Sequence, residues 1–258
     1  MRLRPRAAAS PRGFVYGDFQ FDIDPASPEF LTKGVFSGYQ PIDGDQDIAE
    51  TELSREDWVK LLYLAHVDKR RAFSLYAQHY IATDGQTYWS DTHQLGVYID
   101  SYHAEVDRLM KAPHKCSEMI TELYVPVERA IDFLHAAAAT LTALKAEVIY
   151  GTIRLINEDT ETVLAWARGR RACVIFNLHV EHTPARIEKS AVAFRALIDL
   201  ALERSGSFFL TYHRHATRAQ LLAAYPRLPE FLQAKDAHDP QGVFTSDWHR
   251  WLTRTLTG

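Results

Sequence analysis

Hydrophobic and polar residues alternate with a period of two in several segments of this chain. Such alternation is typical of strands that bury one face of a sheet. It is clearest in CVIFNLHVEH, residues 173–182, whose apolar face is formed by Val174, Phe176, Leu178 and Val180. The opposite face is formed by Cys173, Ile175, Asn177, His179 and Glu181. That second face carries an amide, an imidazole and a carboxylate, which are groups that can bind a ligand.

The same patterns predict the remaining elements. Ser54 caps a long helix that breaks near Asp68, and the Pro-, Gly-, Asp- and Ser-rich segment before it is predicted as loop. Strands are predicted at 14–23, 117–125, 147–156, 171–182 and 207–215. Helices are predicted at 55–80, 126–146, 162–169 and 184–205, with two short helices before residue 239, and the predicted loop covers 24–53.

This order of elements predicts an α+β fold, with helices covering one face of an antiparallel sheet and the other face open. If the predicted strands are neighbours, the period of two lets six polar side chains line the open face: Glu122, Thr152, Arg154, Asn177, His179 and Tyr212. For the strand at 207–215 the pattern leaves open which face points inward. A half-covered sheet also exposes polar residues to solvent as a matter of course, so spacing alone leaves that interpretation open. The mixture of Tyr, His, Asn and Arg, with little Lys, favours a ligand surface.

Composition excludes several classes of protein. The chain has 258 residues and a formal net charge of -4, which argues against a nucleic-acid-binding protein. Two cysteines cannot form a disulfide framework and predict a reducing, cytoplasmic location. No apolar run is long enough to span a membrane. Residues 1–13 are Arg-rich and are predicted to be a disordered tail before one domain at 14–258; a transit-like peptide and a start partway through a larger fold are the alternatives.

The histidines do not predict a metal site. His179 and His182 are three apart on a strand and therefore point to opposite faces. His213 and His215 can share a face, but no third ligand is evident beside them. Asp91 and His93 can pair only if their loop folds them together. The sequence also lacks GxSxG, HExxH, P-loop and GxGxxG motifs.

The last third of the chain carries a family resemblance. Tyr225-Pro226 and the turn DPQGVF at 239–244 resemble the C-terminal end of FAD-linked oxidases of the vanillyl-alcohol-oxidase type, in the branch with aldonolactone, alditol and decaprenylphosphoryl-ribose oxidases. ELYVP at 122–126 is similar to the strand-to-helix step of their substrate domain. The resemblance begins near Gly13. It implies a substrate (cap) domain, with FAD bound mainly by a flavin domain that this sequence does not contain.

The resemblance also implies roles for residues on the predicted open face. Arg154 would stabilise the developing alkoxide or the reduced flavin, and His179 or Tyr212 would accept the hydroxyl proton. Substrate hydroxyls would be bound by Glu122, Thr152 and Asn177. Relatives often carry His-Trp-x-Lys on the last strand, where this chain has Phe209-Leu210-Thr211-Tyr212, so Tyr212 replaces the lysine. This departure leaves the substrate and the catalytic base open.

Two functions follow from these expectations. In the first, the chain is the substrate-binding half of an FAD-dependent oxidoreductase that oxidises an alcohol or sugar-type CH–OH group, inactive without a flavin domain. Its partners are then a small-molecule substrate and a separate flavin-domain chain. In the second, it is a non-catalytic small-ligand or subunit-interaction module, which predicts a homodimer. A metal-dependent hydrolase is disfavoured by the scattered histidines.

Overall fold

The structure is a computed structural model, and it describes residues 2–5, 13–42, 51–89 and 102–257. Residues 6–12 of the predicted tail and the Asp91–His93 pair lie outside the described residues. Arg2–Pro5 forms strand β1, which pairs with β3 and β4, whereas the sequence predicts a disordered tail there. In the described part of the chain no helix is both long and apolar enough to cross a membrane.

The strands form one eight-stranded sheet in the order β4-β1-β3-β2-β6-β7-β5-β8. Every described pair is antiparallel, which confirms the predicted sheet type. The strands after β1 are β2 (Tyr16–Phe21), β3 (Gly34–Ile42), β4 (Tyr88–Trp89), β5 (Cys116–Pro126), β6 (Val148–Ile156), β7 (Arg171–Glu181) and β8 (Ser207–Phe208). β6, β7 and β5 lie side by side in the sheet and have 9, 11 and 11 residues, and we call these three the long strands.

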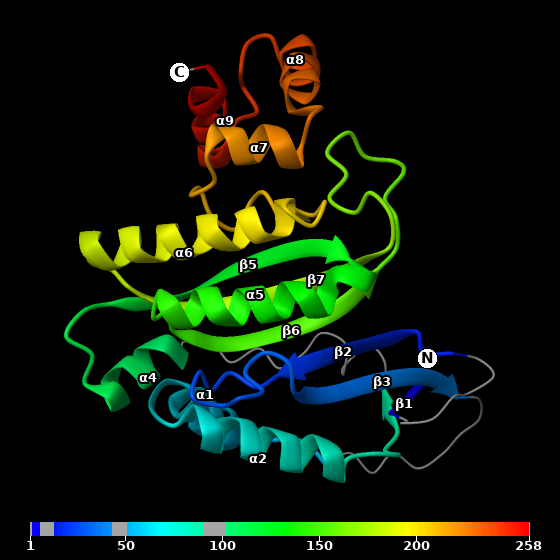
Figure 1. The fold of residues 1–258 in the computed structure, drawn as a ribbon, viewed down its shortest axis with the longest axis vertical. Helices are drawn as coiled ribbons and strands as arrows, with labels where there is room; N and C mark the ends of the chain where they lie inside the picture. Colours follow the sequence, from blue (N-terminus) through cyan, green and yellow to red (C-terminus); the bar gives the residue numbers. More distant parts are fainter. Residues whose placement is uncertain (1, 6–12, 43–50, 90–101, 258) are drawn as a thin grey trace.

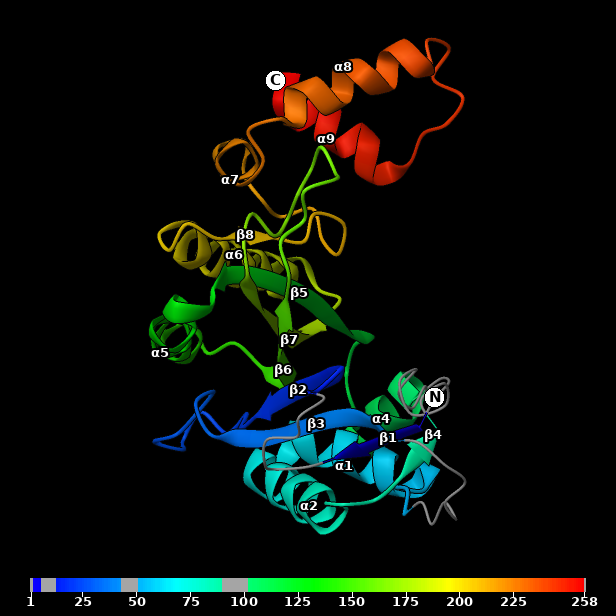
Figure 2. The same ribbon diagram turned by 90° about the vertical axis from the view of Figure 1, so that its right-hand side faces the viewer.

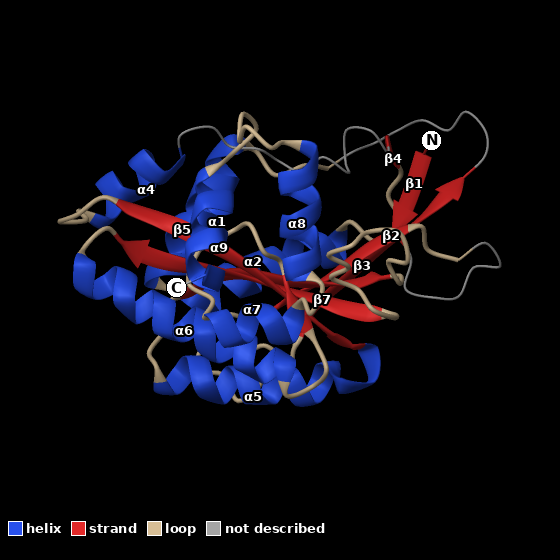
Figure 3. Cartoon of the chain, turned by 90° about the horizontal axis from the view of Figure 1, so that it is seen from above, coloured by secondary structure: helices blue, strands red, loops and turns tan. Residues whose placement is uncertain are grey.

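The helices form three groups (Figures 1 and 2). α5 (Ala130–Ala143), which follows the 3-10 turn Val127–Arg129, and α6 (Pro184–Leu202) cover one face of β5–β7. The helices α1 (Arg55–Val67), α2 (Lys69–Ala82) and α4 (Tyr102–Met110) lie near β1–β3. The C-terminal group is α7 (Arg218–Ala224), α8 (Leu228–His238) and α9 (Asp247–Thr257). Figure 3, from above, shows α6 and α5 running alongside the long strands. The fold is therefore α+β, as predicted.

The main core lies between the long strands and α5–α6. Phe176 of β7, Leu134 of α5 and Phe194 of α6 are each at most 1% exposed. Gly151 makes room for the ring of Phe21, because a Cβ at this position would lie 2.0 Å from that ring. Phe21 in turn contacts Phe176, with 5.6 Å between the ring centroids. This close approach explains a glycine in the middle of a central strand.

Three predicted segments differ from the structure. The predicted loop at 24–53 contains strand β3, whose hydrogen bonds to β1 and β2 offset its weak strand propensity. Residues 162–169, predicted as helix, form turns and bends. The predicted strand at 207–215 shortens to β8, because the main chain beyond it contacts α9 instead: Trp248 donates a hydrogen bond of 2.8 Å to the Leu210 carbonyl.

The second face of the sheet is not open along its whole length, which corrects the sequence prediction. His66 of α1 lies 3.0 Å from Glu118 of β5, and Lys69 of α2 donates a hydrogen bond of 2.7 Å to the Val148 carbonyl of β6. The α1–α2 pair therefore covers this face at the Cys116 end of β5. The sequence pattern missed this cover because the helices come from a distant part of the chain.

Candidate functional site

The sheet register places the predicted strand residues on one face. Glu122 of β5 and Thr152 of β6 both pair with Ile175 of β7, one from each side. Arg154 pairs with Cys173, and Asn177 pairs with both Tyr150 and Ile120. Paired residues of neighbouring strands point the same way, so these side chains share one face. β6, β7 and β5 are neighbours in the sheet, which is the condition for the shared face.

Glu122 is the centre of a group of hydrogen-bond donors on this face. The Tyr124 hydroxyl donates to Glu122 Oε2 at 2.6 Å, and the Tyr212 hydroxyl donates to Oε1 at 3.1 Å. The buried Cys173 thiol lies 3.7 Å from Oε2. We call Glu122, Tyr124, Cys173 and Tyr212 the Glu122 cluster. Tyr212 reaches it from the irregular segment after β8, so the predicted strand is not needed to bring these residues together.

The surroundings of Tyr212 favour its protonated phenol. Partial burial, followed by the charge of Glu122 and the hydrogen bond to it, raises the Tyr212 pKa to about 12. The same influences, with burial again the largest, raise the pKa of the Tyr124 phenol. At neutral pH both rings are therefore hydrogen-bond donors to a carboxylate. Tyr212 is 43% exposed, so its oxygen can also meet a ligand.

Arg154 supplies an available positive charge beside this cluster. Its side chain is exposed, and no described carboxylate forms an ion pair with it. Burial raises the pKa of Asp18 on β2. A hydrogen bond from Thr152 and the charge of Arg154 both lower this pKa, but burial has the larger effect. Thr152 donates that bond at 2.9 Å and is fully buried, so its hydroxyl is already engaged.

Asn177 lies one pleat further along the same face. Its side-chain oxygen Oδ1 is buried and has no hydrogen-bond partner among the described residues. A buried acceptor without a donor costs free energy, on the order of 1–3 kcal/mol. Such a group in a native structure is often completed by a ligand or a water molecule.

His179 is separate from Arg154 and Tyr212, and this separation corrects the predicted grouping of the three. It lies six residues along β7 from Cys173, the partner of Arg154, which corresponds to roughly 20 Å. Its Nδ1 instead lies 3.4 Å from Glu118 Oε1. No single substrate atom can meet both His179 and Arg154.

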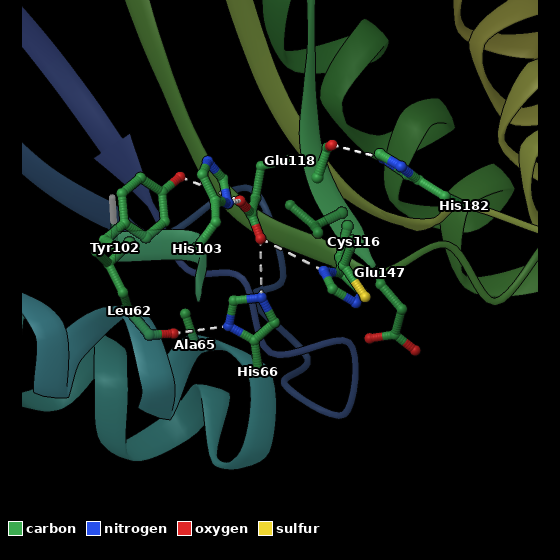
Figure 4. A network of polar contacts seen from close by, with 12 residues as sticks. Leu62, Ala65, His66, Tyr102, His103, Cys116, Glu118, Glu147 and His182 are labelled. Carbon is green, nitrogen blue, oxygen red and sulfur yellow. Dashed lines mark hydrogen bonds and ion pairs between the residues drawn. The ribbon is translucent and has the colours of Figure 1, made fainter. Parts of the chain in front are cut away.

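Glu118 is the centre of a second group, shown in Figure 4. His66 Nε2 lies 3.0 Å from Glu118 Oε1, the Tyr102 hydroxyl donates to Oε2 at 3.1 Å, and His103 Nδ1 contacts Oε2. Burial opposes ionisation of Glu118, but the bonds from His179 and His66 and the charge of His103 outweigh it and hold its pKa below the usual value. We call these five residues the Glu118 cluster: His66, Tyr102, His103, Glu118 and His179.

Several members of both groups were not found by sequence reasoning. Asp18 and Glu118 do lie on the polar faces of predicted strands, in phase with residues that were selected, so the period of two could have found them. His66 and His103 come from helices, and no sequence spacing predicts which helix residue will meet a given strand residue. His179 and His182 do point to opposite faces, as predicted, since His182 contacts Ser117 rather than Glu118.

His213 and His215 do not form a metal site with a third described ligand. The His213 ring stacks on Phe194 at 4.3 Å, and its Nε2 lies 3.2 Å from Thr121 Oγ1. Burial, and then the charge of His215, lowers the His213 pKa to about 3. The pair is therefore part of the packing beneath α6.

This burial predicts acid sensitivity. The His213 pKa is near 3 in the folded chain and about 6.5 in the unfolded chain, so between these values the unfolded chain binds the extra proton. Stability should fall as pH drops through this window, with His213 contributing up to about 1.4 kcal/mol per pH unit. Urea unfolding from pH 7 to pH 4 measures the slope, and His213→Gln should reduce it. Equal slopes for His213→Gln and the exposed control His135→Gln would contradict the assignment.

Comparison with known proteins identifies the family of the matched region. The family model of D-arabinono-1,4-lactone oxidase matches residues 88–252. This match covers β5, β6, β7 and the helices α5 and α6 that pack on them, and includes both the Glu122 cluster and Arg154. No curated protein matches the chain. Because the family model covers more than half of the sequence, the chain belongs to the D-arabinono-1,4-lactone oxidase family, a family of FAD-linked oxidases.

Proposed function

We propose that this chain binds the substrate of an FAD-dependent oxidoreductase that oxidises a CH–OH group of a sugar-type small molecule. The observation that carries the proposal is the Glu122 cluster beside Arg154, which has no ion-pair partner among the described residues. Both lie within the region that matches the oxidase family. A carboxylate, a phenol and a guanidinium together can bind a polyhydroxylated ligand and stabilise negative charge on one of its oxygens.

FAD fits this face in part. When bound, the flavin supplies the hydride acceptor for alcohol oxidation. The Arg154 cation and the unpaired Asn177 oxygen suit the polar edge of a flavin ring or the hydroxyls of a substrate. The sequence, however, has no glycine-rich phosphate-binding motif. We therefore assign the dinucleotide mainly to a flavin domain outside this sequence, on a separate chain or in a longer protein.

Each residue of the face has a proposed role. Arg154 stabilises the alkoxide that develops as the substrate loses its proton, while Glu122 and Asn177 bind substrate hydroxyls. Tyr212 accepts the proton on its oxygen and passes its own proton to Glu122 Oε1, to which it is already hydrogen bonded. This relay avoids a free tyrosinate, which the raised Tyr212 pKa disfavours. Thr152 orients Asp18 rather than the substrate.

The proton relay is tested by removing either end of it. We expect Tyr212→Phe and Glu122→Gln each to slow flavin reduction by about 10²-fold, because both remove the same proton transfer. The chain is co-expressed with a family flavin domain, and flavin bleaching by D-arabinono-1,4-lactone and by alditols is followed. Since the two residues act as a unit, the double variant should be no slower than the slower single variant.

Tyr16→Phe is the matched control, because Tyr16 is 44% exposed on β2 and belongs to neither cluster. Its rate should equal that of the unchanged chain. Flavin reduction that is equally fast with Tyr212→Phe would refute the relay. Stoichiometric FAD on the chain purified alone would refute the assignment of the dinucleotide to another domain.

A subunit-interaction module is the second candidate, and one observation favours it. Phe14, Val15 and Phe36 are 43–56% exposed on neighbouring segments around β2 and β3, and the rings of Phe14 and Phe36 are in contact. An exposed apolar surface of this kind is typical of interfaces. A stable homodimer that stays inactive with every flavin domain would support this candidate over the oxidoreductase. The free, buried thiols Cys116 and Cys173 suit the reducing cytoplasm, which we propose as the location in either case.

A further inference from the structure

The Glu118 cluster joins three elements that are far apart in the sequence. His66 belongs to α1, Glu118 to β5 and His179 to β7. Their side chains are only 2%, 4% and 12% exposed. The cluster is also separate from the Glu122 cluster, because Glu118 and Glu122 are four residues apart on one strand, or roughly 13 Å. The proposed oxidation gives these buried polar groups no role.

The tautomer of His66 leaves an electrostatic conflict. His66 Nδ1 lies 2.7 Å from the Leu62 carbonyl, which can only accept, so Nδ1 carries a hydrogen. In a neutral ring, Nε2 is then a lone-pair acceptor, yet it points at Glu118 Oε1 from 3.0 Å. Two acceptors at this distance repel each other unless a positive charge lies between them or on one of them.

His179 aims at the same oxygen. Its Nδ1 lies 3.4 Å from Glu118 Oε1, and its ring stands perpendicular to that of His66 with 4.8 Å between the centroids. One carboxylate oxygen thus faces two imidazole nitrogens. The three ligand atoms, one from each residue, all lie within 4.8 Å of one another.

We propose that His66 Nε2, Glu118 Oε1 and His179 Nδ1 bind a divalent transition-metal ion of the zinc class. Ligands of tetrahedral zinc lie about 2.1 Å from the ion and therefore about 3.4 Å from one another. The two separations from Glu118, 3.0 and 3.4 Å, are close to this value. Bringing the two imidazoles together needs a small side-chain movement only. Two imidazoles and one carboxylate favour zinc over the oxygen-binding ions Mg²⁺ and Ca²⁺.

The surroundings hold the ligands in the orientation that metal sites require. The Leu62 carbonyl accepts from Nδ1 and so fixes the tautomer of His66, as carbonyls do for metal-binding histidines. Tyr102 and His103 both contact Glu118 Oε2, which leaves Oε1 to the ion. Figure 4 shows His66, Tyr102 and His103 around Glu118. A bound ion would fasten α1 to the sheet, so its role is to stabilise the fold rather than to take part in the oxidation.

Metal binding is tested on the full chain after treatment with a chelator and removal of the chelator. Titration calorimetry with Zn²⁺ should give one ion per chain, and saturating Zn²⁺ should raise Tm by roughly 5 °C, because only the folded chain assembles the ligands. Co²⁺ should give the visible absorption of a tetrahedral site. His66→Gln and His179→Gln should each weaken Zn²⁺ binding by about 100-fold or more.

His182→Gln is the matched control, because His182 is near the cluster but contacts Ser117. It should bind Zn²⁺ like the unchanged chain. If His66→Gln fails to fold, Glu118→Asp is the substitute variant. It keeps the negative charge but shortens the side chain by one methylene, so it should weaken Zn²⁺ binding. No stoichiometric binding of Zn²⁺ or Co²⁺ would mean that a proton alone resolves the conflict, and would overturn the proposal. Unchanged affinity in His66→Gln, His179→Gln or Glu118→Asp would overturn it too.

Discussion

Replacing Arg154 with alanine is expected to slow substrate oxidation by about 10²–10³-fold in the complex of this chain with a flavin domain. The guanidinium is exposed on the sheet face, has no described ion-pair partner, and pairs across the strands with Cys173 of the Glu122 cluster. Its charge is therefore free to stabilise an alkoxide on a substrate bound at Glu122. Because this charge matters most as negative charge develops, kcat should fall more than KM rises.

Two further variants distinguish this role from a structural one. Arg154→Lys keeps the positive charge and should recover part of the rate that Arg154→Ala loses. If Arg154 had only a structural role, keeping the charge would not restore the rate. Arg254→Ala removes an exposed arginine from α9, far along the chain from the long strands, and should leave the rate unchanged. Flavin reduction by Arg154→Ala at the normal rate would remove Arg154 from the site.

The sheet face could be predicted because strands obey a strict local rule. Side chains alternate regardless of tertiary context, so Arg154, Asn177 and Glu122 were placed on one face from spacing alone. The predicted apolar face of β7 is buried, with Val174, Phe176, Leu178 and Val180 each at most 2% exposed. What spacing cannot supply is register, and the register shows that His179 lies too far from Arg154 to share its substrate.

The helices show a different limit. Ile131 and Ile187 fit the apolar stripes of α5 and α6 in the sequence, yet they are 62% and 42% exposed. Both lie in the first turns of their helices, where the stripe reaches the rim of the core. Phe194, in the middle of α6, is fully buried as expected. Periodicity therefore identifies a helix face, but the extent of the sheet beneath decides which residues of that face are covered.

The Glu118 cluster lies beyond sequence reasoning for a further reason. Strand patterning describes one element at a time, whereas this cluster is assembled by contacts among α1, α4, β5 and β7. The sequence pattern predicts that the polar face is open, so its polar residues are expected to contact solvent or a ligand. The helices α1 and α4 bury these polar residues. A buried carboxylate requires charged or hydrogen-bonding partners that an exposed carboxylate does not.

Glu118→Ala is therefore expected to be strongly destabilising even without metal. The substitution removes the buried carboxylate that His66, His179 and Tyr102 all contact, and with it the link from α1 and α4 to β5. Breaking a buried charged network from one side costs about 3–5 kcal/mol in free energy of unfolding. Urea unfolding in the presence of a chelator measures this loss separately from any effect of a bound ion.

Glu122→Ala is the control for that loss, because Glu122 lies on the same face of the same strand. It has two tyrosine donors rather than a histidine network, and Tyr212 is 43% exposed and can bond to water instead. We expect its cost to be about 1 kcal/mol. A Glu118→Ala chain as stable as Glu122→Ala would show that α1 and α4 are held to the sheet by apolar packing, with the histidines and their carboxylate contributing little.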